Sequence, residues 1–286
     1  MADIVFRHYD QAGLDRQLNL RARWPEHAGY FARWASESAV VRARLACRLD
    51  LAFGPGAAER LDFFPAALQP PGGAPLLAFI HGGYWQGLDK GDFSYLAPPF
   101  VGRGIAFASL NYTLAPAGRV AQMVEEVGRA LAWLLDRAGS LGIDASRVLV
   151  AGHSAGGHLA VAALAGQGAR NGHTLLGACS ISGVYDLEPI RLSYHQAVVG
   201  IDRQTVAACS PVRMTPPAGA RVVCAVGGEE TDEFLRQQAD FVATWRGQGA
   251  AVSEVPLPGR NHFTAADALA EPSQGLFRAV TALLQP

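Results

Sequence analysis

One serine in this chain stands between two glycines where the sequence pattern changes. Gly152-His153-Ser154-Ala155-Gly156 follows a short apolar run and precedes an alanine-rich helical pattern. A glycine two positions before and after the serine allows a strained turn, because a Cβ there would collide with neighbouring chain. A glycine turn with an incidental serine is the alternative, but the strand–turn–helix context favours a nucleophile presented at the turn.

A serine hydroxyl needs a base to accept its proton. The chain contains eight histidines, and His262 follows the last strand-like run and opens the loop before the final helical pattern. In this type of site the base comes after the nucleophile and the acid in chain order, which favours His262. His153 and His158 lie in the turn and its helix, where packing is the expected role.

The base in turn needs a carboxylate that fixes its tautomer and stabilises its cation. The stretch GGEETDEF (227–234) follows the strand-like run RVVCAV and offers several acidic side chains. We select Glu230, with Glu229 and Asp232 as open alternatives. Asp232 and Glu233 also suit the first turn of a helix, where acidic residues interact favourably with the helix dipole.

Attack on a carbonyl creates an oxyanion, which requires preorganised donors. FIHGGYW (79–85) ends a strand-like run, so the N–H groups of Gly82 and Gly83, with that of Ala155, are the predicted oxyanion hole.

An aromatic wall for the substrate could come from Tyr84, Trp85 and Tyr185, with core packing as the alternative for the first two; Tyr194 is a further candidate. Arg191 or Arg213 could pair with a substrate carboxylate, although surface solvation is the preferred interpretation.

These residues lie between predicted strands and helices that alternate regularly along the chain. From Pro75 onward, short apolar runs alternate with amphipathic helical patterns such as 120–139 and 232–249. This alternation predicts an α/β fold with a mostly parallel central sheet, helices on both faces and the active site at the carboxyl ends of the strands.

The expected organisation is one domain over 1–286. Residues 1–48 have helical spacing and form an N-terminal helical extension, and two short strands follow within 49–53 and 59–65. The segment of about 186–217 is too long for a plain connection between strands, so we expect a partly helical flap over the site.

Composition narrows the function further. The 286 residues are 50% hydrophobic and 17% charged, with a formal net charge of −1, which argues against nucleic-acid and membrane partners. No run reaches the roughly 18 apolar residues of a membrane span and the N-terminus lacks a signal-peptide core, so a cytoplasmic location is expected. The four cysteines have no metal-ligand spacing. A small-molecule substrate is the expected partner, and the oligomeric state stays open, a homodimer included.

Several motifs together resemble one family. The stretches that carry the likeness are HGGYWQ (81–86), GHSAGGHLA (152–160), SGVYDLEPI (182–190), SP (210–211), DEFLRQQ (232–238) and NHF (261–263). They make the chain similar to the arylformamidase (kynurenine formamidase) group of the α/β-hydrolases, and NYTLAP (111–116) is similar to the hormone-sensitive-lipase-like branch. The likeness covers nearly the whole chain.

The resemblance implies an α/β-hydrolase fold with a catalytic triad. Ser154 and His262 match its nucleophile and base, and Glu230 stands four residues before Phe234, at the position of the acid, where family members more often have Asp. The expected activity is hydrolysis of a small aryl formamide such as N-formylkynurenine, with a carboxylesterase as the alternative. The resemblance implies no metal and no organic cofactor, and nothing here is similar to the unrelated metal-dependent kynurenine formamidases.

Overall fold

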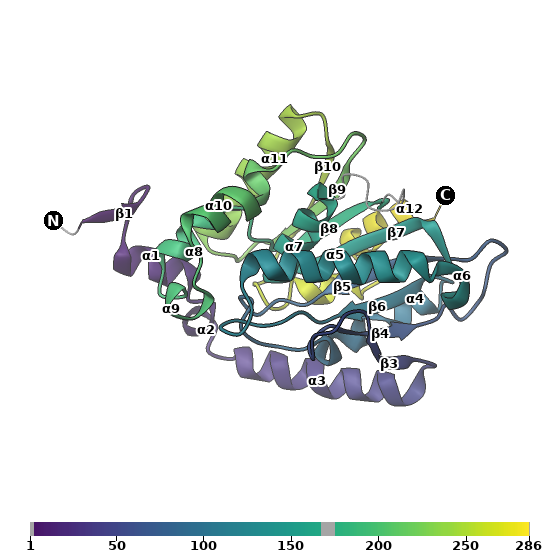
Figure 1. Ribbon diagram of the computed structural model, residues 1–286. Helices are drawn as coiled ribbons and strands as arrows, with labels where there is room; N and C mark the ends of the chain where they lie inside the picture. The colour runs from purple at the N-terminus through teal and green to yellow at the C-terminus, as the bar shows by residue number, and fades with distance from the viewer. Residues whose placement is uncertain (1–2, 167–174, 286) are drawn as a thin grey trace.

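The computed structural model describes residues 3–166 and 175–285, and an eight-stranded sheet runs through its centre (Figure 1). In spatial order the strands are β10 (Ala251–Leu257), β9 (Arg221–Gly227), β8 (Gly177–Ile181), β7 (Ile143–His153), β5 (Ala74–Ile80), β6 (Ala106–Leu110), β4 (Arg60–Phe64) and β3 (Arg48–Ala52). The strands from β10 to β6 are parallel, whereas β4 and β3 pair antiparallel at one edge. The predicted mostly parallel sheet is confirmed.

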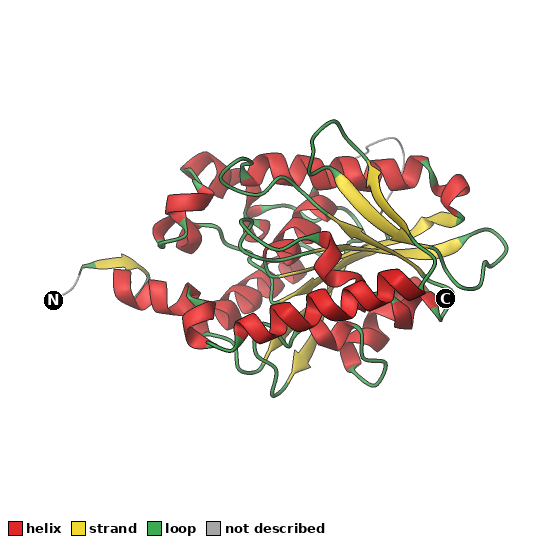
Figure 2. Ribbon diagram, turned by 90° about the horizontal axis from the view of Figure 1, so that it is seen from below, coloured by secondary structure: helices red, strands yellow, loops and turns green. Residues whose placement is uncertain are grey.

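Helices cover both faces of this sheet (Figure 2). The elements of the main body are η1 (Lys90–Leu96), α4 (Pro98–Val101), α5 (Val120–Asp136), α6 (Ala138–Leu141), α7 (Ala155–Ala165), α11 (Asp232–Gly247), η3 (Ala266–Leu269) and α12 (Gly275–Leu284). α5, α7 and α11 lie on one face, and α4, η1 and α12 lie on the other. Strands β5, β6 and β8 are therefore buried along their whole length, which explains why their sequences are apolar without alternation.

The longest amphipathic pattern forms α5 as the spacing predicts. Its buried residues recur every three or four positions and include Met123, Val127, Ala130 and Leu134, so one stripe of the helix faces the interior, where α5 packs against α7 and α10. The helix ends at Asp136, three residues before Gly139.

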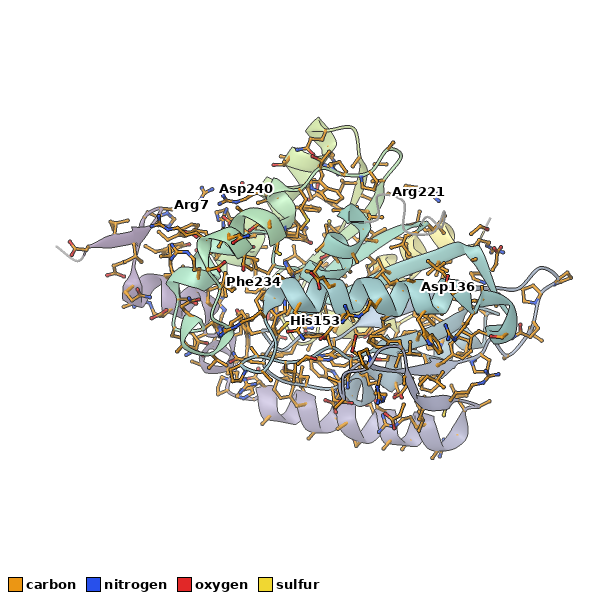
Figure 3. The ribbon with its side chains drawn as sticks, viewed as in Figure 1. Arg7, Asp136, His153, Arg221, Phe234 and Asp240 are labelled. Carbon is orange, nitrogen blue, oxygen red and sulfur yellow. The ribbon has the colours of Figure 1, made fainter. Side chains whose placement is uncertain are left out.

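The N-terminal segment begins with a small hairpin that the sequence analysis did not predict. Its strands are β1 (Ile4–Phe6) and β2 (Tyr9–Asp10), and the helices α1 (Gln11–Leu18), α2 (Leu20–Arg23) and α3 (His27–Arg44) follow. An ion pair of 3.0 Å joins Arg7 of the hairpin to Asp240 of α11 (Figure 3).

One carboxylate of the body, that of Asp267, binds two side chains of α3. Asp267, in η3, accepts hydrogen bonds from Arg33 Nη2 (2.6 Å), Trp34 Nε1 (3.1 Å) and the Tyr95 hydroxyl (3.0 Å). Trp34 is completely buried. The N-terminal helices are thus packed against the chain that follows His262.

The segment expected as a flap contains four short helices. They are α8 (Glu188–Leu192), α9 (Gln196–Val199), α10 (Arg203–Cys209) and η2 (Pro211–Arg213). α8 packs against α1, α9 and α10 (Figure 1). No helix within 3–166 or 175–285 has the length and hydropathy that a membrane crossing requires.

Candidate active site

Ser154 occupies a sharp turn between β7 and α7. Its φ of +57° and ψ of −119° are unusual for a residue with a side chain. A Cβ on Gly152 would collide with the backbone of Gly156, and a Cβ on Gly156 would collide with the carbonyl oxygen of Ile80. Both glycines are therefore required by close backbone approach, as the motif predicts.

The loops after β9 and β10 bring an acid and a histidine together. These strands are parallel neighbours, so their carboxyl ends meet at the same edge. The N–H of Glu229 donates to the carbonyl of Arg260 at 3.0 Å, and Gly227 leaves no room for a Cβ against that same carbonyl. This tie places Glu230 on one loop beside His262 on the other.

The His262 imidazole is held on its Nδ1 side. Nδ1 lies 3.0 and 3.1 Å from the two carboxylate oxygens of Glu230, whose side chain is fully buried. The rings of Phe234 and His153 each lie 4.8 Å from the imidazole and are labelled in Figure 3. Because an ionised carboxylate only accepts hydrogen bonds, Nδ1 carries the proton and Nε2 remains basic.

Asn261 shapes the loop that carries this histidine. Its Oδ1 accepts hydrogen bonds from the N–H groups of Phe263 (3.0 Å) and Thr264 (2.9 Å), and its Nδ2 donates to the Tyr30 hydroxyl at 3.2 Å. The side chain thus closes a local turn directly around His262.

His153 links the turn of the nucleophile to the histidine loop. Its Nε2 donates to the carbonyl of His262 at 2.8 Å. Burial, with a smaller contribution from His262, lowers the pKa of His153 to about 3. His153 therefore stays neutral near pH 7 and adds no positive charge beside His262.

Ser154 and His262 line one cavity of about 220 Å³. Its walls comprise Asn19, Leu20, Arg21, Phe31, Trp34, Gly83, Tyr84, Gln86, Leu88, His153, Ser154, Tyr194, His195, His262 and Phe263. Among the described residues, no hydrogen bond joins the Ser154 hydroxyl to His262; such bonds often tighten only in the complex with substrate.

The residues predicted to form an oxyanion hole are Gly82, Gly83 and Ala155. A Cβ on Gly82 would stand 3.0 Å from Ser154 Cβ and 2.8 Å from the carbonyl oxygen of His153, so this glycine is pressed against the turn. Gly83 has a φ of +101° and lines the cavity. Ala155 is the first residue of α7, and amides in the first turn of a helix have no partner within that helix.

Tyr84 lines the cavity. Its hydroxyl donates to the carbonyl of Leu18 at 2.9 Å, and its ring stacks on His195 at 3.8 Å. Burial is the main reason why the pKa of His195 falls to about 4. These contacts join the glycine-rich loop, the N-terminal segment and the segment of 186–217 at one place.

Trp85 and Tyr185 require a correction, since both lie in the core and outside the cavity lining. The left-handed backbone of Trp85 places its ring at 5.2 Å and 87° from that of His158. The Tyr185 hydroxyl donates to Ser180 Oγ at 2.9 Å, and its ring stacks on Phe241 at 4.3 Å. Neither aromatic ring forms part of the wall.

The sequence analysis missed the walls that the N-terminal segment supplies. Leu20, Arg21, Phe31 and Trp34 line the cavity, although they lie more than 100 residues before Ser154 in the chain. Arg23 and Trp24 follow in the same stretch, and no motif distinguishes one arginine from the other. Only the packing of α2 and α3 on the body shows that Arg21 lines the cavity and Arg23 does not.

The three buried cysteines are Cys179, Cys209 and Cys224. Burial raises the pKa of the Cys224 thiol to about 12, which makes it an unreactive apolar side chain. Within the part of the chain that the structure describes, no group of three or more His, Cys, Asp or Glu side chains could hold a metal ion.

Comparison with known proteins gives consistent results. A family model described as BD-FAE matches residues 61–183. Kynurenine formamidase of Danio rerio is 28% identical over 247 residues, which are 83% of this chain and 82% of the fish protein. That of Salmo salar is 28% identical over 231 residues, or 78% of this chain and 77% of that protein.

Two solved structures extend the likeness to the whole fold. A protein of Silicibacter sp. TM1040, provisionally named a thioesterase, has 30% identity and a TM-score of 0.83, with 94% of this chain and 98% of that chain covered. Esterase B from Lactobacillus rhamnosis has a TM-score of 0.73 over 93% of this chain and 96% of its own, at 17% identity. The latter likeness concerns the fold alone.

Proposed function

Because the chain belongs to the α/β-hydrolase superfamily and has kynurenine formamidases and esterases as relatives, we propose that this enzyme is a serine hydrolase that cleaves small aryl formamides. N-formylkynurenine is the example that we propose as substrate. A hydrolase of the formamidase or esterase type follows from the relatives; the serine mechanism and the substrate are the proposal.

One observation carries the mechanism. His262 Nδ1 faces both oxygens of the buried Glu230 carboxylate, while His262 and Ser154 line the same cavity. An imidazole held in this way can take a proton through Nε2, and the buried carboxylate stabilises the imidazolium that forms. Glu230 supports this role better than the exposed Glu229 and Asp232.

In the proposed reaction Ser154 Oγ attacks the formyl carbon and its proton passes to His262 Nε2. The N–H groups of Gly82, Gly83 and Ala155 stabilise the oxyanion of the tetrahedral intermediate. His262 then donates the proton to the departing arylamine, which leaves a formyl ester on Ser154. Water, activated by the same imidazole, hydrolyses that ester and releases formate.

The cavity fits a small substrate with an aryl group. Its volume of about 220 Å³ and its aromatic walls, which include Phe31, Trp34, Tyr84 and Phe263, favour a planar ring. An aryl ring also withdraws the nitrogen lone pair and so weakens the amide bond. A carboxylesterase on small esters would use the same groups and is the second candidate.

Kinetics with matched substrates test the proposal. We expect kcat/KM for N-formylkynurenine to exceed that for p-nitrophenyl acetate, and Ser154→Ala to abolish turnover of both. If the ester is the better substrate, the carboxylesterase replaces the formamidase. Turnover that survives in a folded Ser154→Ala variant would exclude this serine as the nucleophile.

A further inference from the structure

The cavity carries one permanent positive charge. Among the described residues of its wall, Arg21 is the only arginine or lysine, and no aspartate or glutamate is present. The pKa values of His153 and His195, lowered mainly by burial to about 3 and about 4, keep both rings neutral near pH 7. A ligand in this cavity therefore meets a cationic side chain with no acidic wall residue to balance it.

Its neighbours locate the Arg21 guanidinium at the wall of this cavity. Its Cζ lies 5.7 Å from the centre of the Phe31 ring, and its Nη2 would lie 4.0 Å from a Cβ on Gly87. Its charge acts on Tyr194 and His195, which also line the cavity. The side chain is exposed, so a charged ligand can reach it.

The guanidinium keeps its hydrogen-bonding capacity for a ligand. Within residues 3–166 and 175–285, no ion pair or hydrogen bond engages Arg21. The Asp15 carboxylate forms no ion pair with Arg21 and instead accepts hydrogen bonds at Oδ1 from Gln11 Nε2 (3.1 Å) and from the N–H of Tyr194 (3.0 Å). An arginine fork with free donors is suited to bind a carboxylate through two parallel hydrogen bonds.

The arginines considered from the sequence lack this freedom. Arg191 binds the Glu188 carboxylate through two nitrogens, at 2.6 and 2.8 Å, and Arg213 lies 3.7 Å from Asp186. Neither lines the cavity.

We infer that Arg21 is the subsite for a carboxylate carried by the aryl part of the substrate, so that this enzyme selects substrates with a carboxylate at this place over those of the same shape with an uncharged group there. This inference rests on the proposed function for the reaction that follows binding. The aryl ring lies against Phe31 and its neighbours, the carboxylate meets Arg21, and the scissile bond points to Ser154. Arg21, which belongs to the N-terminal segment, thus determines substrate specificity at a site whose proposed catalytic residues follow strands of the sheet.

Binding of a non-reactive pair of ligands tests the subsite. The probes are 4-oxo-4-phenylbutanoate and its amide, which share a shape and differ in charge, and their Kd values are measured by calorimetry. We expect the wild type to bind the acid about 10- to 100-fold more tightly than the amide, the range of a charge-assisted hydrogen-bonded pair. Arg21→Met should remove this preference and Arg21→Lys should keep part of it.

Arg23→Met is the matched control. Arg23 belongs to the same helix but lies over Trp24, with its guanidinium 3.4 Å from the Glu229 carbonyl, outside the cavity lining. Its removal should leave the preference intact. Equal affinity of the wild type for acid and amide, or a preference that persists in Arg21→Met, would overturn the inference.

Turnover separates this inference from the proposed function. With N-formylkynurenine and its carboxamide as substrates, the ratio of the two kcat/KM values should fall about 10- to 100-fold in Arg21→Met. A protein that binds the acid through Arg21 but hydrolyses no formamide would refute the proposed reaction and support the subsite. Formamide hydrolysis with the same ratio in both proteins would refute the subsite and support the reaction.

Discussion

At the scale of single residues, the site depends on how one imidazole is held. Both carboxylate oxygens of Glu230 face the single N–H at Nδ1, and Phe234 and His153 flank the ring. Each contact restricts rotation of the His262 imidazole, so its Nε2 is held in one orientation. The reactivity proposed for Ser154 therefore depends on a carboxylate that never touches the serine.

Replacement of that carboxylate tests its role. Glu230→Gln keeps the size of the side chain but can donate to Nδ1, which favours the wrong imidazole tautomer. We expect kcat to fall about 100- to 10,000-fold while KM and the melting temperature change little. Glu229→Gln is the control, because Glu229 is exposed, and its kcat should match the wild type. If kcat falls equally in the two variants, Glu230 has no specific role in catalysis.

The sequence predicts these residues unequally. Gly152, Gly156 and their order before a helix mark Ser154, since the backbone constraint is local. The choice of Glu230 over Glu229 and Asp232 depends on which way a loop turns, and only the contact with His262 shows it. Trp85 and Tyr185 look like wall residues in a linear sequence, but their rings turn into the core.

At the scale of elements, α7 approaches the sheet through Gly156. Its Cα faces the carbonyl oxygens of Ile80 and His81 at the end of β5, and a Cβ would collide with the first and lie 2.6 Å from the second. The start of the helix that follows Ser154 is therefore fixed against the end of β5, just before the loop that carries Gly82 and Gly83.

A single methyl group tests this packing. Gly156→Ala should reduce the free energy of unfolding by about 1–3 kcal/mol, as overpacking in a rigid core does, and should lower kcat because Ala155 moves with the helix. Gly29→Ala is the control, since nothing lies within 4 Å of that position in α3; it should be neutral or stabilise by up to about 1 kcal/mol. Urea unfolding measures both, and an unaffected Gly156→Ala would contradict the close approach.

The sequence predicts whether a segment is a helix or a strand better than it predicts which other elements that segment packs against. The alternation of apolar runs and amphipathic helices predicts the parallel sheet, because burial on both faces leaves a clear pattern. The hairpin of Ile4–Asp10 and the position of α2 beside the cavity leave none. Their placement depends on contacts between residues far apart in the chain, such as the ion pair of Arg7 with Asp240 and the hydrogen bond of the Tyr84 hydroxyl to the Leu18 carbonyl.

At the scale of the whole molecule, several histidines are buried in neutral form. Burial lowers the pKa to about 3 for His153 and to about 4 for His158 and His195. In the unfolded chain each returns to about 6.5. The unfolded state therefore binds more protons below pH 6.5, and stability present above that pH is lost as the pH falls towards 4.

We accordingly expect the free energy of unfolding to decrease between pH 6.5 and 5, by up to about 1.4 kcal/mol per pH unit for each such histidine. His158→Gln should reduce the slope of the unfolding free energy against pH, by up to the contribution of one bound proton. Its amide can still donate to the Cys209 carbonyl that His158 Nε2 contacts at 2.8 Å. Urea unfolding at several pH values measures the slopes, and identical slopes for variant and wild type would contradict the account.

The most direct test of the whole site compares Ser154→Ala, His262→Ala and the double variant in steady-state kinetics. If the two side chains act as one unit, each single variant loses about 10⁴- to 10⁶-fold in kcat and the double variant loses no more than the worse of the two. Losses that multiply in the double variant would mean that serine and histidine act independently, which contradicts the proposed mechanism.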